Sequence, residues 1–395
     1  MRAWPSSLLR SISLYKTHVA RLSPQKGDRV VVAMSGGVDS SVVAKLLADK
    51  DYDLSAVYMR NWDTRDESGT DSGCEWKKDW ADVQRVCRRP VTGVLDASFR
   101  ASSGDLEKGG TPNPDIWCNR EVKFGALLDH ITPKDSWLAT GHYADKAWFP
   151  HPSLASHIFS SNITTPRPQL MRPADRTKDQ TYYLSSISEA ALARALFPIA
   201  KFKKTEVREM AQRWGLPTAQ REESMGICFV GEKQRFNDFI SQYIPPNPGL
   251  IIDLETGKTL TTHQGLWSYT VGQGARIRGM PQKMFVAKKD PVKNEIYVVP
   301  GSDHPALSCN SIWANEWEWI WKDSPPAGIE DQGFRARMQF RHRMLDVPCV
   351  VRRRSVDGMI HITFQQPQTG IAQGQVAAVW EGNWCLGCGV IVETE

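Results

Sequence analysis

Residues Val30 to Ser41 read VVVAMSGGVDSS, and this stretch decides the fold of the first part of the chain. A run of β-branched residues ends in a glycine-rich turn, which leads directly into SVVAKLLADK, a segment with the apolar spacing of a helix. A strand, a glycine turn and a helix start together bind anions, because backbone N–H groups point outward and the helix dipole favours negative charge. Gly36 and Gly37 let the backbone approach a phosphate closely. The pattern therefore predicts a phosphate-binding strand–turn–helix unit.

The turn is not a Walker A loop, which needs a lysine after its last glycine. It resembles the SGG-x-DS loop of the ATP pyrophosphatases, a family that cleaves ATP between its α- and β-phosphates and transfers AMP to an oxygen. Ser35, Ser40 and Ser41 add hydroxyl donors, whereas Asp39 is a poor neighbour for a phosphate unless a metal ion lies between them. A plain turn with glycines for packing is the alternative, and the match of SGGVDS to this pattern between a strand and a helix favours phosphate binding.

Length and composition set broad limits. The 395 residues are enough for two or three domains, and 41% hydrophobic residues are enough for a core. No apolar run reaches the roughly 18 residues of a membrane-spanning helix, so no membrane association is expected. A net charge of +5 is compatible with an RNA partner. Eight cysteines scattered along so long a chain argue against a disulfide scaffold and favour a reducing compartment.

The first 27 residues contain no Asp or Glu, and basic residues alternate there with serines and leucines. This composition is typical of a mitochondrial transit peptide, because a secretory signal has a longer apolar core. A basic leader without a targeting role is the alternative. We expect residues 1–27 to be a transit peptide and the protein to be mitochondrial.

Strand-like and helix-like segments alternate after the loop, which predicts a parallel sheet. Strands are expected at Leu54–Met59 and Trp137–Thr140, and helices at Trp76–Arg88, Ser185–Leu196 and Lys204–Trp214, with a loop over residues 150–173. Beyond about Gly272, short strand-like runs separated by turn residues indicate a small barrel or sandwich. The fold class expected is therefore α/β: a doubly wound parallel-sheet domain over residues 28–199, a small central helical region over 200–283, and a C-terminal antiparallel β-barrel over 284–395.

A second informative block, GGTPNPDIWCNREVKFG, covers Gly109–Gly125. Two prolines restrict the residues before them, so Thr-Pro-Asn-Pro is a stiff loop. Cys118 stands near the start of the helix-like segment that follows, where the helix dipole and nearby Arg120 and Lys123 favour its thiolate. For one cysteine by itself, a small buried apolar side chain is the commoner interpretation.

A third block, EESMGICFVG, places Cys228 in a short apolar run. It too could be a core cysteine. Two such blocks in a chain with an AMP-forming loop favour chemistry, because an oxygen activated by AMP needs a nucleophile to displace it. A thiolate or persulfide is a good nucleophile at neutral pH.

From about Arg29 to the C-terminus the chain resembles the tRNA-specific 2-thiouridylase family in its mitochondrial form. The resemblance rests on motifs in order along the chain: AMSGGVDSS, YMRNW, TPNPDIWCNREVKFG, ATGHYA, KDQTYYL, ESMGICFVG, HQGLWSYTVGQ, VVPGSDHPAL and PQTGIAQGQ. It implies an enzyme that uses ATP and Mg²⁺ to adenylate O2 of the wobble uridine in certain tRNAs. A persulfide then supplies sulfur to C2, and AMP leaves. A sulfur-donor protein is the implied partner besides tRNA.

The resemblance also implies roles for individual residues. Cys228 matches the persulfide-carrying cysteine, Cys118 matches the partner with which it forms a transient disulfide, and Asp115 matches an acid/base residue. The implied ATP site comprises Ala33, Met34, Ser35, Gly36, Gly37, Val38, Asp39, Ser40, Met59 and Gly141. Contacts to tRNA are implied for Asn113, Pro114, Asp115, His142, Lys178, Asp179, Gln180, Arg341, His342 and Gln375, the first three at the target base. No metal-ligating residues are implied.

Two departures from the family pattern leave alternatives open. The interval between Cys87 and Thr111 is short and lacks an expected aromatic-rich helix, and His342 stands where the family has Tyr. A catalytically impaired tRNA-binding protein is one alternative. Another AMP-forming ligase on the same loop, such as an amidating synthetase, is a second, although no glutaminase region is recognisable. The C-x-x-C pair Cys385 and Cys388 lacks the second pair that structural zinc needs and is interpreted as incidental.

Overall fold

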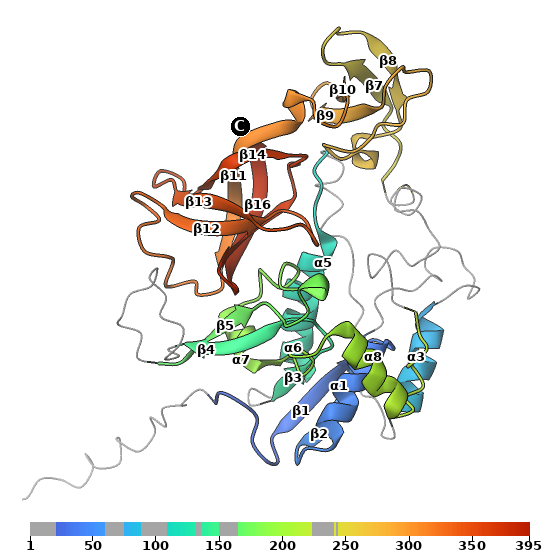
Figure 1. The fold of residues 1–395 in the computed structure, drawn as a ribbon, viewed down its shortest axis with the longest axis vertical. Coiled ribbons are helices and arrows are strands. Elements are labelled where there is room, and N and C mark those ends of the chain that lie inside the picture. Colours follow the sequence, from blue (N-terminus) through green and yellow to red (C-terminus); the bar gives the residue numbers. More distant parts are fainter. Residues whose placement is uncertain are drawn as a thin grey trace, which may run out of the picture.

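The structure is a computed structural model that describes residues 21–59, 75–87, 109–131, 136–149, 165–222, 241 and 244–395. Cys228, the short interval 88–108 and most of the expected leader lie outside these residues. Within the described part the strands form three sheets (Figure 1). No helix there is both long enough and apolar enough to cross a bilayer.

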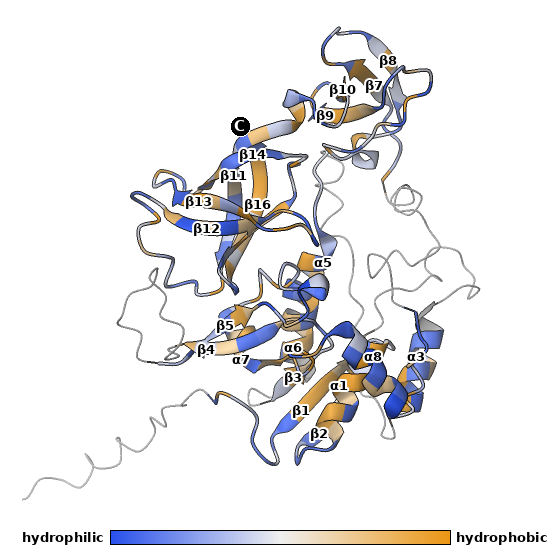
Figure 2. Ribbon diagram, in the orientation of Figure 1, coloured by the Kyte–Doolittle hydropathy of each residue, from blue (hydrophilic) through white to orange (hydrophobic). Residues whose placement is uncertain are grey.

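The first sheet is parallel, with the strand order β2-β1-β3-β6. Its strands are β1 (Arg29–Met34), β2 (Asp53–Tyr58), β3 (Trp137–Ala139) and β6 (Ala195–Leu196). The helices around it are α1 (Val38–Ala48), α3 (Glu75–Val86), α5 (Pro114–Trp117), the π-helix η2 (Cys118–Ala126), α6 (Leu127–Ile131), α7 (Glu189–Arg194) and α8 (Lys204–Arg213). Figure 2 shows β1 as largely hydrophobic and the outer helices α3 and α8 as largely hydrophilic.

Side chains of β1 alternate between two cores, as the two-residue period of a strand requires. Val30 and Val32 pack in a core that contains residues of α1 and α8, while Val31 packs in a second core with residues of α6 and α7. Both faces of the parallel sheet are therefore covered by helices. This confirms the predicted doubly wound α/β domain.

The last sheet closes into a barrel. It consists of β11 (Ser308–Trp319), β12 (Phe334–Gln339), β13 (Val347–Arg353), β14 (Ile360–Thr369), β15 (Val376–Glu381) and β16 (Trp384–Thr394). Every pairing between these strands is antiparallel, and β11 pairs with both β14 and β16, which closes the ring. The C-terminal β-barrel is thus confirmed, with fully buried side chains such as Trp380 and Ile362 inside it.

The middle of the chain differs from the expected helical region. After α8, residues 249–300 form a separate four-stranded sheet, β8-β7-β10-β9, around a small apolar core. Its strands are β7 (Gly249–Asp253), β8 (Thr259–His263), β9 (Met284–Asp290) and β10 (Glu295–Pro300). The sheet crosses the expected boundary after residue 283, because β10 pairs with both β7 and β9. The barrel accordingly begins at β11. Runs as short as GLIID do not distinguish strand from helix by periodicity.

The expected loop over residues 150–173 also contains a strand. β5 (Arg167–Met171) pairs with β4 (Asp145–Phe149) and, through Leu170 and Cys385, with β16 of the barrel. The hairpin therefore extends the barrel sheet into the α/β domain, and one continuous core contains residues of both. Pro168 and the polar residues of RPQLM are untypical of a strand, so the local pattern does not indicate β5. Its register is set by partners distant in sequence. Short 3₁₀ helices complete the fold: η3 (Arg176–Lys178), η4 (Leu266–Ser268) and η5 (Pro305–Leu307).

Arg172, which directly follows β5, joins the two domains electrostatically. Its side chain is only 3% exposed, and its guanidinium donates to Asp179 at 2.7 Å and to Asp346 at 2.8 Å. The same group lies 4.3 Å from the centre of the Trp380 ring, at the barrel. A buried cation between two carboxylates holds the segment after β5 against the β12–β13 turn.

Replacing Arg172 by Met is expected to lower the free energy of unfolding by about 3 kcal/mol, because it leaves the buried Asp179 carboxylate without this cation. Arg337→Met is the matched control, since Arg337 binds the same Asp346 at 2.6 Å but is 47% exposed. Its loss should cost less than about 1 kcal/mol. Urea unfolding monitored by circular dichroism measures both, and equal losses would contradict the assignment.

Candidate active site

The glycine turn has the predicted geometry. β1 ends at Met34, α1 begins at Val38, and Gly36 between them has φ of 76°, a value that side chains disfavour. A Cβ at Gly36 would lie 2.7 Å from Cα of Asp79, so α3 packs directly against the turn. The side chains of Met34 and Val38 are buried in the core. These two residues can therefore offer a ligand only their backbone.

Hydroxyl groups hold the turn in shape. Ser40 Oγ accepts a hydrogen bond from the Ser35 backbone N–H at 3.2 Å and donates one to the Gly37 carbonyl at 3.2 Å. Ser41 Oγ donates to the same carbonyl at 2.8 Å. The Gly37 N–H donates to Ser35 Oγ at 3.3 Å. The serine hydroxyl groups thus preorganise the loop in the absence of a ligand.

Gly141 and Met59 lie at the same edge of the sheet as the turn. A Cβ at Gly141 would come within 2.9 Å of the Ser40 backbone nitrogen, so the segment after β3 rests on the first turn of α1. Met59 directly follows β2, whose last residue, Tyr58, is in register with Met34. Ligands of open parallel sheets bind at this carboxyl edge of the strands. The structure therefore brings together the residues implied for ATP.

Asp39 is neutralised by a lysine that the sequence did not indicate. Lys204 Nζ donates to both Asp39 carboxylate oxygens at 2.7 Å, and Tyr143 Oη donates to one of them at 3.1 Å. Lys204 comes from the first residue of α8, 165 positions later. The Asp39 carboxylate is thus paired with an ammonium group in this structure, and the metal ion expected between it and a phosphate stays a prediction. Tyr143 was inside the quoted motif ATGHYA, but only the fold shows which way it points.

A second cation holds the other side of the turn. Arg221 donates to the Gly36 carbonyl at 2.9 Å and to Asp82 of α3 at 2.6 Å, and it also pairs with Asp79. These contacts attach α3 and the segment after α8 to the loop. Sequence reasoning missed Arg221, because nothing in its neighbourhood marks a contact with residue 36.

Cys118 lies where α5 passes into η2. Asn113 caps α5, because its Oδ1 accepts the backbone N–H groups of Asp115 at 3.1 Å and Ile116 at 3.4 Å, and Pro114 occupies the first helical position. Cys118 itself is partly buried. The helix-like segment predicted after it is a π-helix, a rare form that occurs frequently at functional sites.

His142 and Gln180 lie next to the ATP-site residues. Gln180 Oε1 accepts the Tyr143 N–H at 2.9 Å, and the Gln180 N–H donates to the Tyr143 carbonyl at 2.9 Å. His142 Nδ1 is 2.9 Å from Thr140 Oγ1. Burial and, to a smaller extent, the charge of Lys123 lower the pKa of His142 to about 3, so its ring is neutral at physiological pH.

The other residues implied for tRNA divide into two groups. Asp179 is bound to Arg172, and Gln375 is buried with its Oε1 accepting the Ala372 N–H at 3.0 Å, so both maintain structure. Arg341 is exposed, and His342 stacks on Tyr183 with ring centroids 4.4 Å apart. Of these side chains Arg341 is the most exposed, while those of His342 and Lys178 are half-buried.

The barrel touches the cysteine block. The Thr111 N–H donates to the Gln373 carbonyl at 2.9 Å, and a Cβ at Gly374 would come within 2.5 Å of the Thr111 nitrogen. The barrel turn that carries Gln375 therefore supports the stiff loop before Cys118. The barrel turn of Gln375, implied for tRNA, and the loop before Cys118, implied for catalysis, are thus in contact although they come from different domains.

Cys385 and Cys388 are buried in β16. Burial raises the pKa of the Cys388 thiol to about 11, which agrees with the interpretation of this pair as incidental. Among the residues that the structure describes, no group of three or more His, Cys, Asp or Glu side chains could hold a metal ion.

Gly36→Ala is expected to destabilise the protein by about 2 kcal/mol or more, because a left-handed backbone and contact with Asp79 both penalise a side chain. Gly37→Ala is the control. Gly37 has φ of −86°, and the nearest atom to its Cβ would be Ser35 Oγ at 3.3 Å. The Gly37→Ala variant should lose less than about 1 kcal/mol of stability. Thermal denaturation of both variants checks the order, and a reversed order would refute the loop geometry.

Comparison with known families agrees with this organisation. Residues 28–232 match the model for the tRNA methyl transferase HUP domain, residues 237–300 the tRNA methyl transferase PRC-barrel domain, and residues 309–391 the aminomethyltransferase beta-barrel domain. The second match contains β7 to β10, and the third lies within the closed barrel.

Individual relatives align over nearly their whole length. A protein of Ralstonia nicotianae named tRNA-specific 2-thiouridylase MnmA is 38% identical over an alignment of 385 residues that covers 93% of this chain and 97% of the relative. A protein of the same name from Staphylococcus aureus is 38% identical over 93% of this chain and 95% of its own length. The resemblance seen in the motifs therefore holds across both domains, and the chain belongs to the tRNA-specific 2-thiouridylase family.

Proposed function

We propose that this protein is a tRNA sulfurtransferase that replaces O2 of the wobble uridine by sulfur at the expense of ATP. The observation that carries the proposal is the 38% identity, over 93% of the chain, to proteins named tRNA-specific 2-thiouridylase. The described site supports it, because a glycine turn of anion-binding geometry, a cation-binding carboxylate and a helix-borne cysteine lie in the same α/β domain.

ATP and Mg²⁺ fit the residues at the turn. Gly36 and Gly37 present backbone without side chains, and the Asp39 carboxylate holds a cation, the Lys204 ammonium, at 2.7 Å from both oxygens. A carboxylate of this kind is an ordinary Mg²⁺ ligand beside substrate phosphates. Bound ATP would supply the AMP group that turns the uridine oxygen into a leaving group.

We propose that sulfur transfer begins with activation of the uridine oxygen. Uridine O2 forms a bond to the α-phosphorus, and pyrophosphate leaves. The terminal sulfur of a persulfide on Cys228 then bonds to C2, and AMP departs with O2. The Cys118 thiolate attacks Sγ of Cys228 and breaks the persulfide S–S bond, so its electron pair remains with the new thiocarbonyl. A cellular dithiol would reduce the resulting Cys118–Cys228 disulfide.

Residues around Cys118 and on the barrel would have specific roles in this scheme. Asn113 and Pro114 fix the start of the helix that presents Cys118, and Asp115 stands on its first turn, where an acid/base group would serve. His142 is neutral, so it can donate or accept a hydrogen bond without adding charge. Arg341, His342 and Lys178 would bind RNA, the cations through its phosphates and His342 through its ring.

A persulfide-carrying protein would load Cys228, because the chain needs a source of sulfane sulfur. We also propose that the protein acts on mitochondrial tRNAs, on the composition of residues 1–27, which are basic and lack Asp and Glu.

Cys228→Ser and Cys118→Ser are each expected to reduce thiolation to background, because each removes a sulfur nucleophile, while ATP binding stays unchanged. The measurement is 2-thiouridine in unmodified tRNA incubated with protein, ATP and a persulfide donor, by mass spectrometry of nucleosides. Cys87→Ser is the matched control, since Cys87 is also partly buried and lies away from the scheme, after α3.

Full thiolation by Cys228→Ser would refute the cysteine roles. Pyrophosphate release should depend on tRNA; release that depends on a small acid would indicate an amidating ligase. Binding of tRNA without any ATP turnover by the wild type would indicate an impaired family member.

A further inference from the structure

The central sheet, β8-β7-β10-β9, touches both segments that place Cys118. These segments are the loop over residues 109–113, here called the cysteine loop, and the barrel turn over residues 370–375. The contacts come from the segment between β8 and β9, which includes the motif HQGLWSYTVGQ. In Figure 1 the chain that leads into α5 runs beside this end of the central sheet. The proposed chemistry gives that motif no role, so its contacts need an explanation.

Two glycines meet where the central sheet touches the barrel turn. Gly272 has φ of 84° and Gly370 has φ of 74°, and a Cβ at Gly272 would lie 2.7 Å from Cα of Gly370. Both backbones are fixed, because the Gly272 N–H donates to the Val286 carbonyl of β9 at 2.7 Å and the Gly370 N–H donates to the Leu307 carbonyl at 2.9 Å. A side chain at Gly272 would therefore push the barrel turn away.

The barrel turn carries such a displacement to the cysteine loop. Hydrogen bonds close the turn, since the Gln375 N–H donates to the Ala372 carbonyl at 3.2 Å and Gln375 Oε1 accepts the Ala372 N–H at 3.0 Å. The two ends of the turn, Gly370 and Gly374, are thus coupled. At the second end a Cβ on Gly374 would come within 2.5 Å of the Thr111 nitrogen. A shift at Gly370 is therefore felt at Thr111.

Leu266 of the central sheet contacts the start of the cysteine loop. A Cβ at Gly109, which has φ of 80°, would lie 3.3 Å from Leu266 Cδ1. Leu266 is 4% exposed and belongs to the apolar core of the central sheet. The chain just after it is tied to β9, because Lys289 Nζ donates to the Tyr269 carbonyl at 2.9 Å. The cysteine loop is thus held between the central sheet and the barrel.

We propose that Gly272 and Leu266 are positioning residues for sulfur transfer, a role that rests on the cysteine chemistry proposed above. Gly272 lets the barrel turn close on the central sheet because it has no side chain, and Leu266 supports the cysteine loop at Gly109. The two prolines of Thr-Pro-Asn-Pro carry this placement into α5 and on to Cys118. Both residues act through the loop and not on the reacting atoms.

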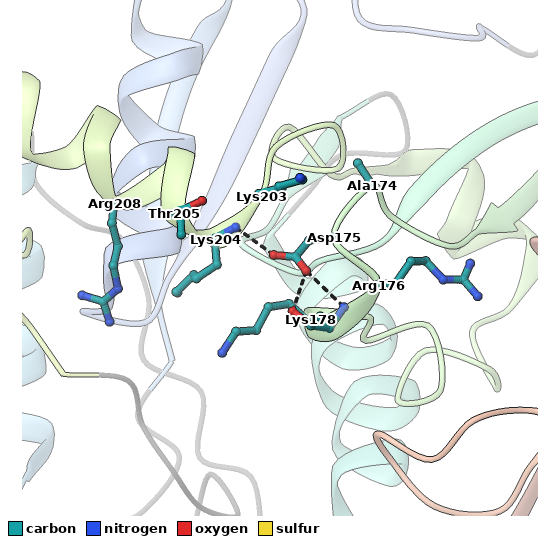
Figure 3. A pocket seen from close by; sticks show the side chains of 9 residues that line it. Ala174, Asp175, Arg176, Lys178, Lys203, Lys204, Thr205 and Arg208 are labelled. Carbon is teal, nitrogen blue, oxygen red and sulfur yellow. Dashed lines mark hydrogen bonds between the residues drawn. The ribbon is translucent and has the colours of Figure 1, made fainter.

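The glycine turn has supports of its own. Asp175 accepts the Lys204 backbone N–H at 2.9 Å, as Figure 3 shows, and Lys204 Nζ donates to Asp39 at 2.7 Å. Arg221 donates to the Gly36 carbonyl at 2.9 Å. All of these residues belong to the α/β domain. Changes at the central sheet should therefore alter the cysteine chemistry and leave the affinity for ATP unchanged.

The test compares Gly272→Ala with Gly279→Ala in the full-length protein. Gly279 has φ of 76°, and apart from its chain neighbours no atom of the described residues lies within 4 Å of its Cβ position. Both variants thus carry similar backbone strain, and Gly272→Ala adds the collision with the barrel turn. The protein is equilibrated with glutathione buffers, and mass spectrometry after thiol blocking measures the Cys118–Cys228 disulfide.

Gly272→Ala is expected to lower the equilibrium constant for this disulfide about 10-fold, which corresponds to about 30 mV, because a misplaced thiol has a lower effective concentration. Its kcat for tRNA thiolation should fall about 10-fold for the same reason. Gly279→Ala should stay within about twofold of the wild type in both measurements. The affinity for α,β-methylene-ATP, measured by isothermal titration calorimetry, should stay within about twofold in every variant.

Leu266→Ala is the second variant and keeps the inference testable if Gly272→Ala does not fold. It should lower the disulfide equilibrium constant about threefold, because the cysteine loop keeps its contact with the barrel. Met284→Ala is the matched control, since Met284 is also 4% exposed in the same core, and it should leave this constant unchanged. Thermal denaturation establishes that each variant is folded at the assay temperature.

The outcomes separate the two proposals. A wild type that neither forms the disulfide nor thiolates tRNA would refute the proposed cysteine chemistry itself, and the positioning role with it. With an active wild type, unchanged disulfide equilibria in both Gly272→Ala and Leu266→Ala would overturn the positioning role alone. Equal shifts in Gly279→Ala or Met284→Ala would also overturn it, because general strain would then explain the effect. A parallel loss of ATP affinity would do the same, since it would indicate a disturbed fold.

Discussion

The buried guanidinium of Arg172 is the constraint on which the rest of the site depends. It ties Asp179 of the α/β domain to Asp346 of the barrel. From Asp179 the contacts continue, because the next residue, Gln180, binds the Tyr143 backbone through two hydrogen bonds. Tyr143 in turn donates to Asp39 at the glycine turn. A few polar contacts thus connect the barrel with the glycine turn.

The two sides of the turn are held by different means. On one side Gly36 packs on α3 and Arg221 binds its carbonyl, so the backbone there is fixed by sterics and by a cation that stays in place. On the other side, among the residues that the structure describes, the Asp39 carboxylate accepts hydrogen bonds from an ammonium and a phenol, both on side chains. A loop of this kind is preorganised in its main chain and adjustable in its charge. That combination would suit the proposed ligand, ATP with Mg²⁺, which is cleaved into AMP and pyrophosphate.

Features that are local in sequence could be predicted, and features made by distant contacts could not. The strand–turn–helix at Gly36 and the barrel followed from short-range patterns, and both were confirmed. The strand β5 was missed because its pairing partners are not adjacent to it in sequence. Residues 150–166 separate it from β4, and β16 belongs to the C-terminal barrel. Lys204 and Arg221 were missed for the same reason, since each acts on the turn from more than 160 positions away. The role of Gln375 was implied by resemblance, yet its side chain is committed to its own turn.

The placement of the cysteine block explains why a barrel belongs to this enzyme at all. The loop before Cys118 is stiffened by two prolines, but prolines fix only local angles. Its position comes from the barrel, because Thr111 donates to Gln373 and lies against Gly374, where a side chain has no room. Tyr182 adds a buried hydrogen bond from the α/β domain to the Val376 carbonyl at 3.0 Å. The barrel therefore sets where Cys118 stands relative to the turn. A displaced barrel would leave the glycine turn intact and still separate it from Cys118, and so would separate the two halves of the proposed chemistry.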